Sequence, residues 1–136
     1  MSERVFIDTN IFVYADDEAE PTKRTKARHV LSGLIREGRA VVSTQVMQEY
    51  FVTAIKKLGL SPERARARVE ALYRLDVVVI RPELVFGAID LHRLNSISFW
   101  DALIVKAASV SGCTRLLSED LSHGHVLDGV KIESPF

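Results

Sequence analysis

The sequence predicts a single α/β domain built on a parallel sheet of four or five strands, with helices on both faces. Short runs of apolar and β-branched residues alternate along the chain with longer stretches of helical periodicity. This alternation is typical of β-α-β units, in which a crossover helix carries the chain back to start the next parallel strand. A length of 136 residues suits one domain covering 1–136, and we find no repeat or linker within it.

The first predicted strand is the short apolar run Arg4-Val5-Phe6-Ile7, which ends at the polar Asp8-Thr9-Asn10. We expect a short helix from Ile11 to Ala15. Pro21 then begins a longer helix, because the apolar residues that follow recur at spacings of three and four, and Gly38 is a stop signal.

The middle of the chain continues the alternation. Ala40-Val41-Val42 is a brief β-branched strand, and Ser43 or Thr44 is expected to cap a helix that runs to about Leu58. Ser61-Pro62-Glu63 strongly predicts the next helix start, because it combines an N-cap, a proline at the first helical position and an acid in the first turn.

The next strand and two helices follow from equally local signals. Val77-Val78-Val79-Ile80 is a continuous β-branched run, typical of a strand buried on both faces of a sheet. Pro82 starts another helix. Ser98-Phe99-Trp100-Asp101 has the form of a capping box, so we expect a buried, alanine-rich helix from Ala102 to Val110 with Asp101 placed in its first turn.

Two further strands complete the prediction. Arg115-Leu116-Leu117-Ser118 is a strand that ends at Glu119-Asp120, and Val130-Lys131-Ile132 is a last short strand. With the three earlier runs these make five candidate strands, which is why we expect four or five in one sheet.

The composition excludes several classes of protein. Hydrophobic residues make up 47% and charged residues 26% of the chain, which is the profile of a globular protein and not of a disordered one. Cys113 is the only cysteine, so the chain can build neither an internal disulfide nor a cysteine-based zinc site. After the charged Met1-Ser2-Glu3-Arg4, only three apolar residues come before Asp8, too few for a signal peptide or a membrane span. We therefore expect a cytoplasmic protein with no membrane partner.

Four acidic residues are expected at one edge of the sheet. Asp8 directly follows the first strand and Asp120 follows the fourth, and the carboxyl ends of parallel strands share the edge where open α/β sheets bind ligands. Glu49 and Asp101 lie near the starts of helices that follow strands or loops, and such helix starts gather at the same edge. Carboxylates from four distant segments are thus predicted to converge.

Converging carboxylates repel one another and lose hydration, so they normally bind cations or raise the pKa of one member. An all-oxygen site without paired cysteine or histidine favours Mg²⁺ or Mn²⁺. In a two-metal site the ions activate water and stabilise charge on phosphorus, so no histidine base is required. The sequence has no evident serine-histidine or cysteine-histidine arrangement and no glycine-rich phosphate loop. Metal-dependent phosphate chemistry is therefore the favoured interpretation.

Taken one at a time, the same acids have purely structural interpretations. Asp8 is at a place where turn and cap residues are common, and Asp101 would stabilise its helix dipole and cap. Glu49 alone fits a solvated helix face, and Asp120 could cap the following turn. The joint pattern of four acids in matching local contexts is what favours the metal site.

Four motifs, in order along the chain, resemble those of the PIN-domain nucleases. They are Phe6-Ile7-Asp8-Thr9-Asn10, Gln48-Glu49, Phe99-Trp100-Asp101-Ala102 and Ser118-Glu119-Asp120-Leu121. Together they span nearly the whole chain, and the closing segment with His123-Gly124 and Val130-Lys131-Ile132 is similar to that of the VapC toxins of bacterial toxin–antitoxin pairs.

The resemblance implies a PIN-like fold and a metal-dependent endoribonuclease that hydrolyses RNA phosphodiester bonds and acts as a toxin. The residues that match the catalytic, metal-binding acids of the family are Asp8, Glu49, Asp101 and Asp120, and those that match its supporting polar positions are Asn10 and Ser118. Mg²⁺ or Mn²⁺ is the implied cofactor. The implied partners are an RNA substrate, a small VapB-type antitoxin whose tail reaches into the acidic groove, and a second copy of the chain in a homodimer. An apolar surface that includes parts of the second or third helix is expected to hold the antitoxin.

The chain departs from the family pattern at one position. Relatives commonly have a further acid two residues after the fourth one, where this chain has Ser122. We therefore expect a weakly held second metal, with Glu119 able to substitute in part. The sequence leaves open whether Asp120 or Glu119 is the fourth acid, and whether one or two ions bind.

Two other functions remain as alternatives. One is a catalytically inactive PIN-like module that binds RNA or protein. The other is a phosphotransfer or phosphatase domain with Asp8 as nucleophile, which is disfavoured because Asp8-Thr9-Asn10 contains no second acid two residues on and no motif lysine is apparent.

Net charge does not separate these alternatives, because 18 basic residues balance 18 acidic ones. With four acids in a metal site, the rest of the chain would carry an excess of four positive charges. Basic residues concentrate on the second and fourth predicted helices: Lys23, Arg24, Lys26, Arg28, Arg64, Arg66, Arg68 and Arg74. They could follow RNA phosphates or simply form solvated faces.

Overall fold

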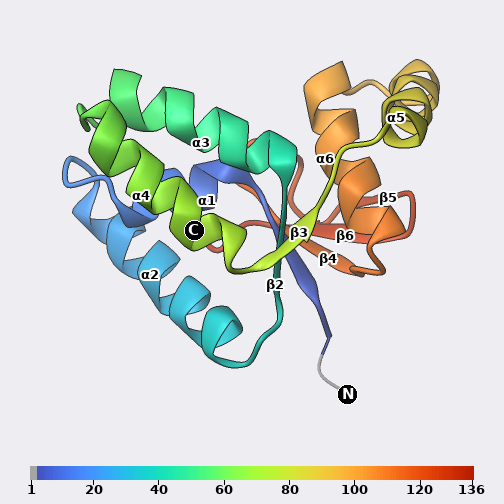
Figure 1. Ribbon diagram of the computed structural model, residues 1–136. Helices are drawn as coiled ribbons and strands as arrows, with labels where there is room; N and C mark the ends of the chain where they lie inside the picture. The colour runs from blue at the N-terminus through green and yellow to red at the C-terminus, as the bar shows by residue number, and fades with distance from the viewer. Residues whose placement is uncertain (1–2) are drawn as a thin grey trace.

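The computed structural model of the chain describes residues 3–136 and has one mixed sheet flanked by six helices (Figure 1). Its strands are β1 (Val5–Ile7), β2 (Ala40–Ser43), β3 (Asp76–Val78), β4 (Arg115–Leu117), β5 (Val126–Leu127) and β6 (Val130–Glu133). Its helices are α1 (Thr9–Ala15), α2 (Pro21–Arg36), α3 (Thr44–Lys56), α4 (Pro62–Tyr73), α5 (Pro82–Leu94) and α6 (Phe99–Val110). The predicted α/β class and the predicted helix starts at Pro21, Pro62 and Pro82 are confirmed.

The sheet has the strand order β3-β2-β1-β4-β6-β5, so β1 lies in the interior with parallel neighbours on both sides. β3 and β6 extend the parallel part. The prediction of four or five strands is corrected to six, because β5 adds a short antiparallel pair with β6. The turn between them is Asp128-Gly129, and both residues have positive φ values, 50° and 78°. Such a two-residue turn needs few strand residues to close a hairpin.

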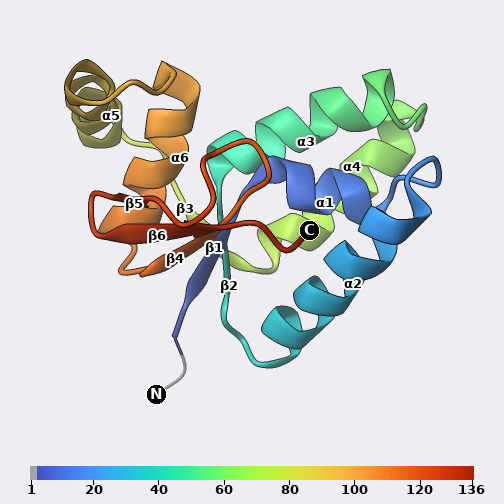
Figure 2. The same cartoon turned by 180° about the vertical axis from the view of Figure 1, so that it is seen from behind.

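The helices cover the sheet in two groups. Figures 1 and 2 show α1 to α4 on one side of the sheet and α5 with α6 on the other. The three residues of β1 are fully buried between them, as are Val41 and Val42 of β2. The small side chains of Ala102, Ala107 and Ala108 are also fully buried, which lets α6 pack closely on the sheet.

One expectation about burial was wrong. The run Val77-Val78-Val79-Ile80 was expected to be buried on both faces, but β3 is an edge strand and Val79 is 49% exposed. β-branched residues favour extended structure at an edge as well as in the interior, so the pattern alone does not distinguish the two.

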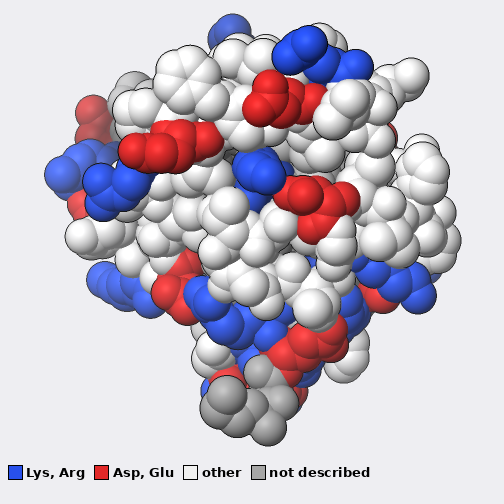
Figure 3. Space-filling view, turned by 90° about the vertical axis from the view of Figure 1, so that its right-hand side faces the viewer, with Lys and Arg blue, Asp and Glu red and all other residues white. Residues whose placement is uncertain are grey.

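The face that carries α5 and α6 presents charged groups of both signs, interspersed with uncharged surface (Figure 3). Exposed apolar side chains there include Phe86 and Leu94 of α5 and Trp100 of α6. Within residues 3–136, no helix has the length and apolar character needed to cross a membrane.

The carboxyl ends of the parallel strands face one edge of the sheet. β1 leads there directly into α1, and β2 leads into α3, whose N-cap Ser43 accepts a hydrogen bond from the backbone N–H of Val46. The first turn of α6 and the loop after β4 reach the same edge (Figure 1). The topology therefore places the expected acidic segments next to one another.

Candidate metal centre

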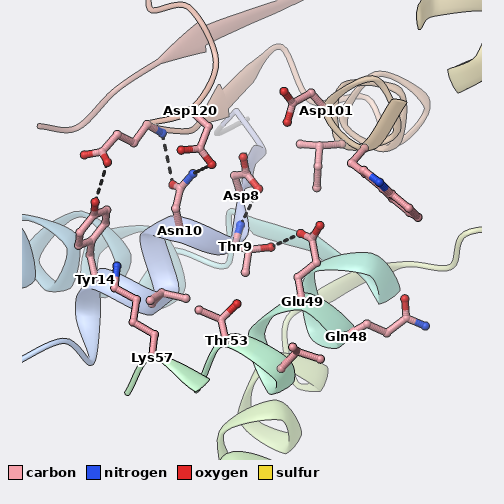
Figure 4. Close-up of a pocket in the computed structure, with 15 residues that line it drawn as sticks. Asp8, Thr9, Asn10, Tyr14, Gln48, Glu49, Thr53, Lys57, Asp101 and Asp120 are labelled. Atoms are coloured by element: carbon pink, nitrogen blue, oxygen red, sulfur yellow. Dashed lines mark hydrogen bonds between the residues drawn. The ribbon is translucent and has the colours of Figure 1, made fainter. Parts of the chain in front are cut away.

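A pocket of about 600 Å³ opens at this edge, and all four predicted acids line it (Figure 4). Asp8 comes from the end of β1, Glu49 from α3, Asp101 from the first turn of α6 and Asp120 from the loop after β4. The structure thus brings together carboxylates from four distant segments, as the parallel topology required. Their assignment as metal ligands stays a prediction that this geometry makes possible.

Asp8 is the most buried of the four, with only 5% of its surface exposed. It caps α1, because its Oδ1 accepts a hydrogen bond of 2.7 Å from the backbone N–H of Thr9. Its Oδ2 accepts a hydrogen bond of 2.8 Å from the hydroxyl of Ser118. The pKa of Asp8 is raised to about 7, chiefly by burial; the two hydrogen bonds lower it, and the charges of Glu49 and Asp120 contribute to raising it.

Glu49 is held from both sides. The hydroxyl of Thr9 donates to its Oε1 at 2.6 Å, and Nε2 of Gln45, one turn earlier on α3, donates to its Oε2 at 3.2 Å. The same amide nitrogen also donates to the backbone carbonyl of Trp100 at 3.2 Å. Gln45 is 4% exposed and so forms a buried link between the helix that carries Glu49 and the helix that carries Asp101.

Asp101 occupies the first turn of α6, where its backbone N–H donates to the Ser98 hydroxyl at 3.0 Å. The N-cap half of the predicted capping box is therefore present. Partial burial raises the pKa of the Asp101 carboxyl, a hydrogen bond with Ser98 lowers it, and the charge of Asp120 raises it. Asp120 thus lies close enough for its charge to act on the carboxyl of Asp101.

Asp120 is oriented by the two residues that were expected to support the site. Nδ2 of Asn10 donates to its Oδ2 at 3.0 Å, and its own backbone N–H donates to Oγ of Ser118 at 3.2 Å. Ser118 is fully buried and contacts both Asp8 and Asp120. A single hydroxyl therefore links the carboxylate of Asp8 to the backbone of Asp120.

The structure favours Asp120 over Glu119 as the fourth acid. Glu119 accepts a hydrogen bond of 2.6 Å from the hydroxyl of Tyr14 and an ion-paired hydrogen bond of 2.6 Å from Lys23. Burial tends to raise the pKa of Glu119, but the contacts with Lys23 and Tyr14 outweigh it and lower the pKa overall. Both carboxylate oxygens of Glu119 are thus engaged, whereas Asp120 has no cationic partner among residues 3–136.

The same holds for the other three acids: in the described part of the chain none of them forms a salt bridge. Unneutralised carboxylates lining one pocket create a strong preference for cations. Over residues 3–136, however, no three acidic, histidine or cysteine side chains lie close enough to hold one ion by themselves. The oxygen donors therefore fit Mg²⁺ or Mn²⁺ bound through one or two carboxylates with water completing the shell, which is the usual mode for Mg²⁺.

The basic residues of α2 and α4 lie outside the acidic pocket. Lys23 pairs with Glu119, while Arg28 and Arg68 lie near the carboxylate of Asp16 at 4.0 and 3.4 Å. None of the basic residues predicted on α2 and α4 lines the acidic pocket.

Sequence reasoning missed Gln45 on α3 and Lys57, the C-cap residue that follows α3. Gln45 bonds Glu49, and Lys57 lines the pocket. Their spacing from Glu49, four residues before and eight after, was the signal that could have revealed them, because residues at multiples of four share a helix face.

Comparisons with known proteins agree with this architecture. The sequence profile of the PIN domain matches residues 5–126. A search of the curated proteins gave no match. Among solved structures, a toxin–antitoxin complex from Klebsiella pneumoniae is similar with a TM-score of 0.73 and 17% identity, covering 97% of this chain and 98% of that one. DNA-bound VapBC from Salmonella typhimurium gives a TM-score of 0.72 and 20% identity, covering 99% and 100%.

A third structure is VapC20 from Mycobacterium tuberculosis, described as a toxin that cleaves the sarcin–ricin loop. It is similar with a TM-score of 0.62 and 18% identity, covering 82% of this chain and 86% of that one. At these identities the likenesses show a shared fold.

Proposed function

Because the chain belongs to the PIN domain family, we propose that it is a metal-dependent endoribonuclease that hydrolyses RNA phosphodiester bonds and acts as the toxin of a toxin–antitoxin pair. Membership of the family confirms the resemblance predicted from the four motifs. One observation carries the proposal: four carboxylates from distant segments line one pocket, and none of them has a salt-bridge partner within residues 3–136.

The residues proposed to hold Mg²⁺ or Mn²⁺ are Asp8, Glu49, Asp101 and Asp120. Bound divalent ions would supply a water of lowered pKa and positive charge opposite the scissile phosphate. The raised pKa of Asp8 supports this assignment, because a carboxylate that is costly to ionise in isolation gains most from a neighbouring cation.

The protein's own contribution is orientation and charge. Thr9 fixes one oxygen of Asp8 through its backbone and one oxygen of Glu49 through its hydroxyl, so the two acids are positioned by one residue. Asn10 similarly orients Asp120. Without cations these acids repel the phosphates of RNA, so the same geometry that prepares the site makes substrate binding depend on metal.

RNA is the proposed substrate, and the cytoplasm is the proposed location. The structural similarity to VapC20, which is described as cleaving an RNA loop, supports RNA over other phosphodiesters. The pocket is also open to solvent beside Trp100, which is 62% exposed, so a strand of nucleic acid has access to the acids.

A VapB-type antitoxin is the proposed protein partner. A second groove, of about 1000 Å³, runs between α2 and α4. Its lining includes the apolar Phe12, Leu31 and Leu72 as well as Arg28 and Arg68. Such a groove fits an amphipathic segment of a partner protein, and two of the similar structures are toxin–antitoxin complexes. The homodimer stays a prediction, to be tested by light scattering of the purified protein.

Cleavage of labelled RNA by the purified chain with Mg²⁺ or Mn²⁺ tests the proposal. Asp8→Asn and Asp101→Asn should each lower the rate by more than roughly 100-fold, because each removes a charged metal ligand. Glu83→Gln is a matched control, since Glu83 lies in the first turn of α5 as Asp101 does in α6 but does not line the pocket.

Undiminished cleavage by a folded Asp8→Asn or Asp101→Asn protein would contradict the assignment. RNA binding without any metal-dependent cleavage by the unmodified chain would favour the inactive binding module instead.

A further inference from the structure

Lys57 is the only cationic side chain among the described residues that line the acidic pocket. It follows α3 as the C-cap residue, and its backbone N–H donates to the carbonyl of Thr53 at 2.8 Å. The side chain is about half exposed, at 52%. It therefore combines access to solvent with a place in the wall of the proposed active site.

Glu49, Thr53 and Lys57 form one row along α3 and its C-cap, because they are spaced by four residues each and all line the pocket (Figure 4). Eight residues of helix correspond to about 12 Å along the axis. Lys57 thus lies two turns from a proposed metal ligand, along the same wall. Glu119, which also lines the pocket, lies near enough to Lys57 to feel its charge, but both of its oxygens already accept hydrogen bonds from Tyr14 and Lys23.

The neighbours of Lys57 orient its ammonium group without saturating it. Nζ lies 3.8 Å from Oδ2 of Asp17, beyond normal hydrogen-bond length, and 5.2 Å from the centroid of the Tyr14 ring. Asp17 is itself fixed, since it is 6% exposed and its Oδ1 accepts a hydrogen bond from the backbone N–H of Ala19. The Lys57 ammonium is therefore held in place with N–H donors left for an anion.

We propose that Lys57 binds a phosphate of the RNA substrate, and that this phosphate flanks the one to be cleaved. The inference rests on the proposed function, because it takes the scissile phosphate to lie at the four acids. An RNA strand that passes over the four acids continues along the pocket. Its next phosphates lie away from the proposed metal ions, so a cationic side chain is needed to neutralise them. A lysine on the same helix face as Glu49 meets this need and sets the register of the strand.

Binding of a short, fluorescein-labelled oligouridine RNA tests this assignment separately from catalysis. The measurement uses the full chain carrying Asp101→Asn, with Mg²⁺ present, and follows fluorescence anisotropy over a series of salt concentrations. Adding Lys57→Gln should weaken binding roughly fivefold and reduce the slope of log Kd against log salt by about 0.7, as expected for the loss of one phosphate contact with a single strand.

Two variants make the result specific. Lys57→Arg should restore both affinity and slope, because arginine also binds phosphate. Lys56→Gln removes the adjacent exposed charge outside the pocket and should leave the slope unchanged. A role limited to stabilising the end of α3 would lower the melting temperature of Lys57→Gln without affecting the slope.

Equal salt slopes for Lys57→Gln and Lys56→Gln would overturn the proposal, as would a parent protein that does not bind the RNA. Failure of the proposed function has a different signature. In that case Lys57-dependent binding would be present, but the chain without any substitution would not cleave RNA with either metal.

Discussion

Substituting Asp8 by asparagine should make the metal-free protein more stable while it abolishes cleavage. The carboxyl has an ordinary pKa of 3.8 and a pKa of about 7 in the folded protein, chiefly because of burial. At a pH between these two pKa values, the Asp8 carboxyl has lost its proton in the unfolded chain but keeps it in the folded protein. The free energy of unfolding therefore falls as the pH rises from about 4 through about 7, and the loss is complete above that range.

The size of the effect follows from the difference in pKa. About three pKa units correspond to about 4 kcal/mol of destabilisation by the ionised carboxylate at pH 8. Asparagine is neutral and nearly isosteric, and its oxygen can still accept the hydrogen bond from the backbone N–H of Thr9. The amide nitrogen of asparagine cannot accept the hydrogen bond that the Ser118 hydroxyl donates to Asp8, so we expect a smaller net stabilisation of about 2 kcal/mol. For a chain of this length that is roughly 6 °C in melting temperature.

Thermal unfolding followed by circular dichroism, with a chelator present, measures this directly. Asp8→Asn should melt above the unmodified protein at pH 8, and the gap should narrow at pH 5, where the folded Asp8 is protonated. Asp90→Asn, on the exposed side of α5, is the control and should leave the melting temperature nearly unchanged at both pH values. Adding Mn²⁺ should stabilise the unmodified protein more than the variant. A lower melting temperature for Asp8→Asn at pH 8, or the same gap at pH 5, would refute the reasoning.

Two other predictions concern the neighbours of the acids. Glu119→Gln should keep most of the cleavage activity, because both oxygens of Glu119 already accept hydrogen bonds from Tyr14 and Lys23. Asp120→Asn should lose most of the activity. Equal losses of the initial cleavage rate in the two variants would contradict the choice of Asp120 as the fourth acid. Gln45→Ala should weaken Mn²⁺ binding roughly tenfold, since Glu49 loses the amide that orients it. If calorimetric titration gave the variant the same Mn²⁺ affinity as the unmodified protein, this role of Gln45 would be contradicted.

Much of the fold could be predicted because its signals are local. Proline at the start of three helices, the Ser98 cap and the β-branched runs each fix an element with a few residues. The convergence of Asp8 and Asp120 then follows from parallel pairing of β1 and β4, since strands that run the same way end at the same edge.

The remaining features depend on contacts between distant segments. The two residues of β5 are too few to give a strand pattern, and the strand exists because the turn at Asp128-Gly129 returns the chain to β6. The pairing of Glu119 with Lys23 joins residues 96 positions apart, and no local pattern reports it. For the same reason the sequence favoured Asp120 as the fourth acid but left Glu119 open as an alternative.

A crystal structure of the protein grown with Mn²⁺, in which anomalous scattering locates the ions, tests the metal centre itself. We expect a peak in the acidic pocket at about 2.1 Å from a carboxylate oxygen of Asp8 or Asp101, and its loss in crystals of Asp8→Asn. Peaks only outside the pocket, with all four carboxylates free of Mn²⁺, would contradict the claim that these acids form a metal centre.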